Sequence, residues 1–435
     1  MIVRRAAVLA VLAVPPVLLL ASGCGREEAP VTLAVDGRVN ANVSMAADGP
    51  FVAAVWSAAD ESGATDVFSA VSTDAGRSFA SPVRVNSAPG DAKVNAEQPP
   101  RLALKPRQGA APEIAVVWTT KGETGTSLLT STSVDGGRAF GASRIVPGSD
   151  AVGNRGWESI ASMPGGGFMA AWLDHRLLAA PQSSSDGEHA HMHEGSHAAS
   201  SMSERDGVAT AQLSQIYVAP VESGADAHPV AAGVCYCCKT AIAAVSDTVL
   251  LAWRHVYAGN MRDIAFTRSN DGGRTFAPPV RISEDNWHLE GCPDDGPAMG
   301  VDAEGTIYIV WPSVIDEAAG PVKSLFLTTS TDGQHFAPRQ QLPTVGQAHH
   351  PQISVARDGA VAVVWDESGE GTRQLAAIGA RRAADGVVHF GEPVRAGDVG
   401  MYPTVVWSEG RWLRAWTAGD PGHSVVRVAP VRLTQ

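Results

Sequence analysis

A short apolar stretch that ends in tryptophan recurs seven times along this chain of 435 residues. The copies occupy residues 51–56, 114–118, 168–172, 249–253, 307–311, 361–365 and 412–416. Successive tryptophans are 51 to 62 residues apart, except for the 81 residues that separate Trp172 from Trp253. The stretches are short, apolar and rich in β-branched residues, as strands buried on both faces should be. The chain is therefore a series of repeated β-units, and one interval holds an insertion.

A second repeated element follows most of these strands. The pattern Ser-x-Asp-x-Gly-x-x-Phe occupies residues 72–79, 133–140 and 269–276, residues 330–336 are one residue shorter, and residues 385–390 form a decayed copy. Its aspartates are Asp74, Asp135, Asp271 and Asp332. In such a turn the aspartate accepts hydrogen bonds from nearby amides, and the glycine adopts a positive φ. The pattern predicts a structural hairpin turn in each repeat.

Together the two elements predict an all-β fold, a β-propeller of four-stranded blades. The Asp-containing turn resembles the Asp box of sialidases and other BNR-repeat proteins. Sialidases have six blades, which is the alternative here, but seven tryptophan strands favour seven blades. The last repeat, residues 401–435, lacks a fourth strand, and we expect residues 31–35 to supply it and close the ring.

The N-terminus has the features of an export signal. A basic pair, Arg4 and Arg5, precedes the apolar residues 6–20 and the segment Ala21-Ser22-Gly23-Cys24,. The segment resembles a bacterial lipobox, although Ala21 stands where leucine is usual. The resemblance implies a signal peptide at residues 1–23, a lipidated Cys24, a linker at residues 24–30 and one propeller domain at residues 31–435. We expect an exported, membrane-anchored lipoprotein, periplasmic or on the outer membrane; the alternative is ordinary secretion with a free Cys24.

Net charge narrows the range of partners. The chain carries a formal charge of −12, and no run of lysine or arginine occurs after the signal. Nucleic acid is therefore not an expected partner. The expected partners are the membrane, through the lipid anchor, and a glycan or an envelope protein. Neither an oligomeric state nor a required cofactor follows from the sequence.

The loops that enter the first strand of each blade form the functional end of related propellers, here called the mouth. Seven soft or borderline ligands fall in these loops: Cys235, Cys237, Cys238, Cys292, His288, His349 and His350. One interpretation is a copper or zinc site of thiolates and imidazoles. The other is one or two disulfides, as an oxidising compartment favours. A mixture of the two also stays open.

The insertion, at about residues 178–208, contains a histidine-rich tract. His189, His191, His193 and His197 lie among serine and glycine residues. This composition is typical of a flexible tract that binds copper or zinc weakly, and equally of a surface loop without a bound ion.

The resemblance to sialidases extends only weakly to catalytic residues. Family enzymes hold a substrate carboxylate with three arginines and use a tyrosine nucleophile assisted by a glutamate. The weak candidates here are Arg101, Tyr402 and Glu290, and none lies in a full family motif. The favoured hypothesis is a binding or scaffold protein of the cell envelope with a copper or zinc site. The alternative is a glycoside hydrolase of the exo-sialidase type.

Overall fold

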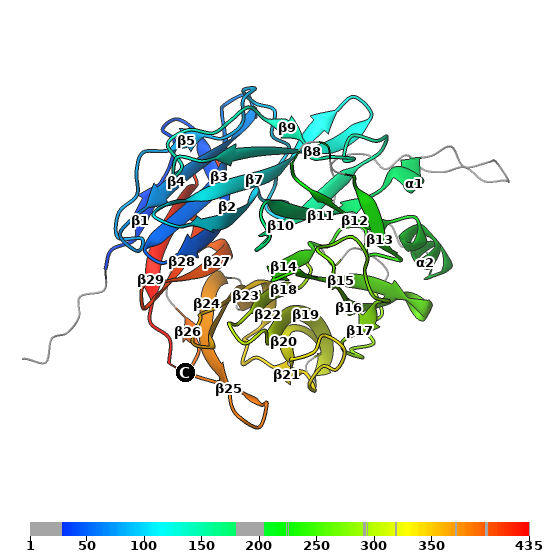
Figure 1. Cartoon of the computed structure of the whole chain (residues 1–435). Helices are drawn as coiled ribbons and strands as arrows, with labels where there is room; N and C mark the ends of the chain where they lie inside the picture. Colours follow the sequence, from blue (N-terminus) through cyan, green and yellow to red (C-terminus); the bar gives the residue numbers. More distant parts are fainter. Residues whose placement is uncertain are drawn as a thin grey trace, which may run out of the picture.

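The computed structural model describes residues 28–179, 204–222, 224, 226–289, 293, 295–317, 320–369, 372–395 and 399–434. Within these ranges the strands form seven antiparallel sheets arranged around a centre (Figure 1). The prediction of an all-β propeller with seven blades is confirmed, and the six-bladed alternative is wrong.

The blades follow one another along the chain, and each begins with its innermost strand. The first blade has β2 (Val39–Asp48), β3 (Phe51–Ala59), β4 (Thr65–Ser72) and β5 (Val83–Arg84). The second has β6 (Arg101–Arg107), β7 (Ala110–Gly122), β8 (Gly125–Ser133) and β9 (Arg144–Ile145). The third has β10 (Arg155–Ser162), β11 (Phe168–Asp174), β12 (Gln215–Pro220) and β13 (His228–Ala232). The fourth has β14 (Ala241–Val245), β15 (Thr248–Tyr257), β16 (Met261–Ser269) and β17 (Val280–Arg281).

The remaining blades keep this order with two changes. The fifth has β18 (Ala298–Val301), β19 (Ile307–Glu317), β20 (Gly320–Ser330) and β21 (Gln340–Gln341). The sixth has β22 (Gln347–Val355), β23 (Ala360–Gly369), β24 (Thr372–Arg382), β25 (Val388–Phe390) and β26 (Val394–Arg395), with both β25 and β26 paired to β24. The seventh has β27 (Met401–Ser408), β28 (Arg411–Ala418), β29 (Val425–Val431) and β1 (Val31–Leu33). The short helices are α1 (Arg176–Ala179), α2 (Glu204–Gln212) and the 3-10 turn η1 (Ala258–Asn260).

The ring closes at two levels. At the centre, each first strand contacts the first strands of the two neighbouring blades, all the way from β2 round to β27 and back. At the rim, β1 pairs with β29, so that Val31 lies opposite Val428 and Leu33 opposite Val426. Figure 1 shows the blue β1 beside the red β29. The strand from the N-terminus therefore completes the last blade, as predicted, and covers an edge that would otherwise be open.

The seven repeated tryptophans lie on the second strand of each blade and are at most 2% exposed. Most of their indole N–H groups donate to a polar side chain, as buried tryptophan requires. Trp365 donates to Glu367 over 2.8 Å, and Trp172 donates to Asp174 over 3.0 Å. The tryptophans thus pack between blades and also orient polar residues at the ends of their own strands.

The aspartate turns have the local hydrogen bonds expected from their sequence. The carboxylate of Asp271 accepts from the amides of Arg274 and Thr275 at 3.0 and 2.9 Å, and from the Thr275 hydroxyl at 2.6 Å. Gly273 in the same turn has φ +86°. Comparable bonds surround Asp74, Asp135 and Asp332. Since these turns join third to fourth strands, they lie at the end of each antiparallel blade opposite the mouth.

Several predicted features fall outside the described residues. They are the signal peptide at residues 1–23, Cys24, the histidines 189, 191, 193 and 197, Glu290 and Cys292. Helix α2 begins within the predicted insertion. None of the helices in the described ranges has the length and apolar character needed to cross a membrane.

Candidate functional site

The first strands carry a repeated backbone distortion at the mouth. Four of them contain a bulge near their start, and the bulge places a non-glycine residue at positive φ. These residues are Asn42 (φ 61°), Trp157 (φ 53°), His350 (φ 53°) and Tyr402 (φ 54°). The left-handed conformation is costly for bulky residues and persists only where the surroundings impose it. Bulges re-aim side chains, and here they do so at one end of the ring.

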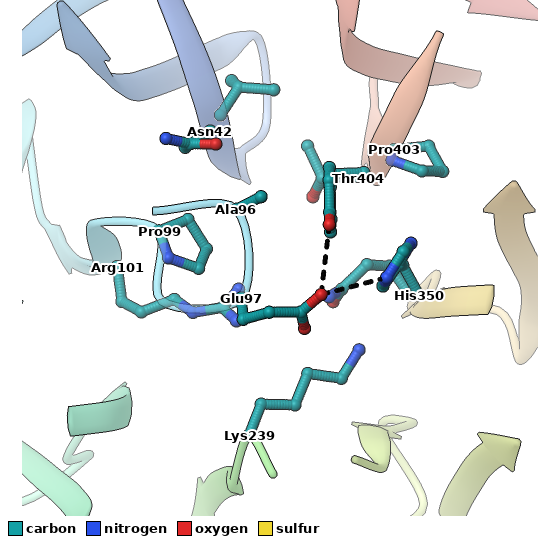
Figure 2. Close-up of a pocket in the computed structure, with 12 residues that line it drawn as sticks. Asn42, Ala96, Glu97, Pro99, Arg101, Lys239, His350, Pro403 and Thr404 are labelled. Carbon is teal, nitrogen blue, oxygen red and sulfur yellow. Dashed lines mark hydrogen bonds and ion pairs between the residues drawn. The ribbon is translucent and has the colours of Figure 1, made fainter. Parts of the chain in front are cut away.

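A small pocket opens at this end. The lining residues are Asn42, Val43, Ala96, Glu97, Pro99, Arg101, Lys239, His350, Gln352, Tyr402, Pro403 and Thr404. They come from the first strands of blades one, two, six and seven and from the loops before β6 and β14. Figure 2 shows Glu97, Arg101 and Lys239 directed into the space in front of His350. The pocket therefore lies on the axis of the propeller, where distant segments meet.

Glu97 is the centre of a hydrogen-bonded group in this pocket. Its Oε1 accepts from the hydroxyl of Tyr402 at 3.1 Å. The same Oε1 lies 3.2 Å from Nε2 of His350, an ion pair drawn as a dashed line in Figure 2. The rings of His350 and Tyr402 contact each other with their centroids 4.0 Å apart and their planes tilted by 34°. Burial and the neighbouring Glu97 carboxylate raise the pKa of Tyr402, so this phenol keeps its proton. Glu97, Tyr402 and His350 thus form one hydrogen-bonded group, in which the carboxylate of Glu97 is the shared acceptor.

His350 is held on its other side by Asp366. Nδ1 of His350 lies 2.7 Å from Oδ1 of Asp366, whose Oδ2 in turn lies 3.0 Å from Nε of Arg373. Burial opposes a charge on the imidazole, but the hydrogen bonds to Asp366 and Glu97 outweigh it and raise the pKa of His350 to about 9,. The ring is therefore an imidazolium at neutral pH and a proton donor to Glu97.

Arg101 supplies the pocket with a guanidinium group that is available to a ligand. It is the first residue of β6, and its guanidinium makes no hydrogen bond or ion pair with any described residue. The charged groups that act on it are Glu158 and Glu97. Burial raises the pKa of Glu158 to about 7, against the opposing charge of Arg101. Near neutral pH this carboxyl is thus only partly ionised, and the charge of Arg101 is not fully balanced.

A second group of ligand-type side chains lies beside the pocket. Asp295, His349 and His350 each offer an atom within 4.8 Å of the other two, an arrangement that could hold a metal ion. Cations of the protein already occupy its surroundings: Nζ of Lys239 lies 3.8 Å from Asp295, and Nζ of Lys323 lies 3.3 Å from Nδ1 of His349. Both ring nitrogens of His350 also have carboxylate partners. A metal ion would have to displace these interactions.

The three neighbouring cysteines form a separate buried cluster in the loop between β13 and β14. Their sulfurs lie within 4.8 Å of one another. Cys235 and Cys238 are free thiols with Sγ atoms 3.2 Å apart. Cys237 is disulfide-bonded, and neither Cys235 nor Cys238 is its partner. None of the three is therefore bonded to another, and a pairing with Cys292 stays a prediction.

The sequence-based candidates thus separate into groups. Arg101, His350 and Tyr402 line the same pocket, and His349 adjoins it. The cysteine cluster adjoins this pocket, because Lys239, which lines the pocket, directly follows Cys238 in the chain. His288 instead forms an isolated backbone β-bridge with Met261, the first residue of β16. It belongs to neither of the two clusters of candidate metal ligands among the described residues. Glu290, the expected partner of Tyr402, lies outside the described residues. Within the described residues, the hydroxyl of Tyr402 donates to Glu97.

Sequence reasoning did not single out Asp366, Arg373 and Lys323. Asp366 directly follows the repeated Trp365 in β23. Arg373 and Lys323 lie near the starts of β24 and β20, the third strands of their blades. These residues could have been predicted from the sequence. In a four-stranded antiparallel blade, the hairpin between the second and third strands lies at the same end as the loop that enters the first strand. A prediction based on the entering loops alone misses these hairpins.

Comparisons with solved structures show related architecture at low identity. An ulvan lyase bound to -[GlcA(1-4)Rha3S]- is 10% identical, covers 93% of this chain and 96% of its own, and has a TM-score of 0.51. The polysaccharide lyase Uly1 is 11% identical over 92% of this chain and 91% of its own, with a TM-score of 0.50. The NanB sialidase of Streptococcus pneumoniae is 10% identical over 94% and 71% of the two chains, with a TM-score of 0.46.

No model of a known protein family and no curated protein sequence matches the chain. The comparisons therefore show its fold, a seven-bladed propeller of the architecture also found in these polysaccharide lyases.

Proposed function

We propose that this chain is a carbohydrate-binding propeller whose mouth takes a sugar carboxylate, such as that of a uronic acid. The observation that carries the proposal is the guanidinium of Arg101, which lies in the axial pocket without a hydrogen-bonding partner among the described residues. A half-buried cation in this state favours an anionic ligand, and arginine matches a carboxylate with two parallel hydrogen bonds. Lys239 supplies a second cation on the same wall.

The neutral part of the pocket suits a sugar ring. Asn42, Gln352 and Thr404 supply groups that can hydrogen-bond hydroxyls, and Pro99 and Pro403 supply apolar surface. Two lyases of the same fold act on polysaccharides, and one was solved bound to a chain containing GlcA. These features support an acidic saccharide as the ligand class.

The experiment is calorimetric titration with short uronate oligosaccharides and with their carboxyl-reduced, neutral counterparts. The wild type should bind only the acidic form. Arg101→Gln should weaken binding by roughly 10- to 150-fold, because a hydrogen bond to a charged group contributes about 1.5–3 kcal/mol. Arg357→Gln is the matched control, since Arg357 is 92% exposed. Equal binding by the wild type and Arg101→Gln, or no binding of any acidic sugar, would refute the proposal.

A second candidate, cleavage of the bound glycoside, is favoured by the bond between Tyr402 and Glu97. This pair has the residue types that sialidase-like enzymes use as nucleophile and assisting base. The protonated His350 beside them could donate a proton to a leaving oxygen. Tyr402→Phe should abolish product release from a sialoside or a uronate polymer while binding persists. If the wild type releases no product from either substrate, the protein only binds.

The cellular setting is part of the same proposal: an exported lipoprotein anchored through Cys24, acting at the cell envelope. Mass analysis of the N-terminal peptide from membranes tests it, and an unmodified Cys24 would contradict it. The copper or zinc predicted for the mouth and for the histidine tract is tested by metal analysis of the purified protein. Loss of stoichiometric metal on deleting residues 183–206 would assign that metal to the tract.

A further inference from the structure

The buried sulfurs between β13 and β14 have a geometry that the proposed carbohydrate site does not use. Cys235 and Cys238 are separated by two residues, the C-x-x-C spacing at which two thiols can close into one disulfide,. Their Sγ atoms are 3.2 Å apart, whereas a disulfide bond is about 2.05 Å long,. A displacement of about 1 Å therefore separates the dithiol from the disulfide. Both residues are at most 1% exposed.

Two buried arginines surround Cys235 without a carboxylate partner among the described residues. Nη1 of Arg262 donates to Sγ of Cys235 over 3.3 Å, and Arg262 is 1% exposed. Arg254 is fully buried and donates only to backbone oxygens of Asp295, Arg262 and Pro312. A buried cation is costly unless an anion balances it. The sulfur of Cys235 is the group placed to provide that negative charge, and Cys238 is the thiol that donates to it.

We propose that Cys235 and Cys238 are a redox-active pair that closes reversibly to a disulfide. In the first step the Cys235 thiolate attacks one sulfur of a small-molecule disulfide, forms a mixed disulfide and releases a thiolate. In the second step Cys238 loses its proton to solvent and attacks Sγ of Cys235, which releases the second thiolate. The two protein sulfurs are oxidised by two electrons in total, and the small disulfide is reduced to two thiols.

The neighbouring Cys237 favours this chemistry over a metal site. A site of three thiolates needs all three cysteines, and Cys237 is disulfide-bonded. Two thiolates on one tetrahedral zinc ion lie about 3.8 Å apart, from a Zn–S distance of about 2.3 Å. The observed 3.2 Å is shorter, and Arg262 already places positive charge against Cys235. The geometry fits a sulfur–sulfur bond better than a shared metal ion.

Access to the pair requires a local opening, and the structure shows where. Helix α2 packs Val208 and Ala211 against the cysteines, together with Val256. The helix has nine residues, and helices this short depend on tertiary contacts for their stability,. Local opening of α2 would expose the sulfurs without unfolding the blades. Oxidation should therefore be slow in the native protein and faster in mild denaturant.

The test uses the whole protein treated with bis(2-hydroxyethyl) disulfide, then denatured in an alkylating reagent and weighed intact. The wild type should lose two alkylatable thiols and regain both after mild reduction. Cys238→Ser should instead keep the reagent on Cys235 as a stable mixed disulfide, because the resolving thiol is gone. A wild type that keeps both thiols in the oxidant, with or without mild denaturant, would overturn the proposal.

Arg262→Gln measures the role of the buried charge. Reaction of Cys235 with the disulfide at pH 7 should slow by about tenfold, because less of the thiol is ionised. Arg268→Gln is the matched control on the same strand, since its guanidinium bonds to the backbone of Asp332 at the far end of the blade. Equal rates for Arg262→Gln and Arg268→Gln would contradict the role of the arginine. Stoichiometric zinc or copper that protects both thiols until a chelator is added would overturn the redox proposal in favour of metal binding.

Discussion

Replacing Glu158 by glutamine should remove a pH dependence from ligand binding at the mouth. Glu158 is 1% exposed, and burial raises its pKa to about 7. Its ionised form competes with a ligand carboxylate for the charge of Arg101. Below pH 7 the carboxyl is protonated and neutral, so Arg101 is available. Above pH 7 the ionised carboxylate offsets part of the charge of Arg101, and the ligand binds more weakly.

The size of the effect follows from that pKa. If the ligand binds only when Glu158 is protonated, the apparent Kd exceeds its limiting value about 1.1-fold at pH 6, about twofold at pH 7 and about elevenfold at pH 8. His350, with a pKa of about 9, stays mostly protonated over this range. Glu158→Gln should bind with one affinity from pH 6 to pH 8. Titration calorimetry at the three pH values measures both proteins, and a wild-type Kd that does not change with pH would refute the competition.

The same substitution has an effect on stability that needs no ligand. The pKa of Glu158 is higher in the folded protein than the ordinary value of 4.5. The folded state therefore binds the proton more tightly, and this stabilisation is complete below pH 4.5 and lost as the pH rises through 7,. Because a tenfold change in proton affinity corresponds to about 1.4 kcal/mol, the unfolding free energy falls by about 3 kcal/mol across this range. Denaturant unfolding at pH 5 and pH 8 should show this loss as a difference between the wild type and Glu158→Gln, because the other titrating groups, such as His350, contribute equally to both proteins,.

Three further changes test the fold and the site. Leu33→Ala should lower the unfolding free energy by about 2–5 kcal/mol, because Leu33 is buried on the strand that closes the ring, while Leu177→Ala at an exposed position should not,; denaturant titration measures both. Asp366→Asn should lower the pKa of His350 from about 9 to about 6–8, as an NMR titration of the imidazole would show, and an unchanged value would exclude the ion pair as its cause,. Asp271→Ala should reduce Tm by a few degrees without changing ligand affinity, because its turn lies at the end opposite the mouth; a loss of affinity would contradict that placement,.

The repeat pattern alone determined the architecture. Each tryptophan strand must be buried on both faces, and each aspartate turn joins two strands, so the spacing of these elements sets the number of blades. Residues 31–35 matched the missing strand of the last repeat, and β1 occupies that place. These features were predictable because they depend on local periodicity and on hydrogen bonds within a few residues.

The composition of the mouth was decided only by the tertiary structure. Glu97 and Tyr402 are 305 positions apart in the chain, and ring closure alone brings them into contact. The sequence indicated both Arg101 and Tyr402 but paired Tyr402 with Glu290, because no local pattern records which loops face each other across the axis. Neighbouring charges then set the ionisation, since burial raises the pKa of both buried carboxyls but Lys239 and His350 bring that of Asp295 below its ordinary value, whereas that of Glu158 stays raised. Such differences arise from the neighbours that the fold places around a residue, and these neighbours lie far away in the sequence.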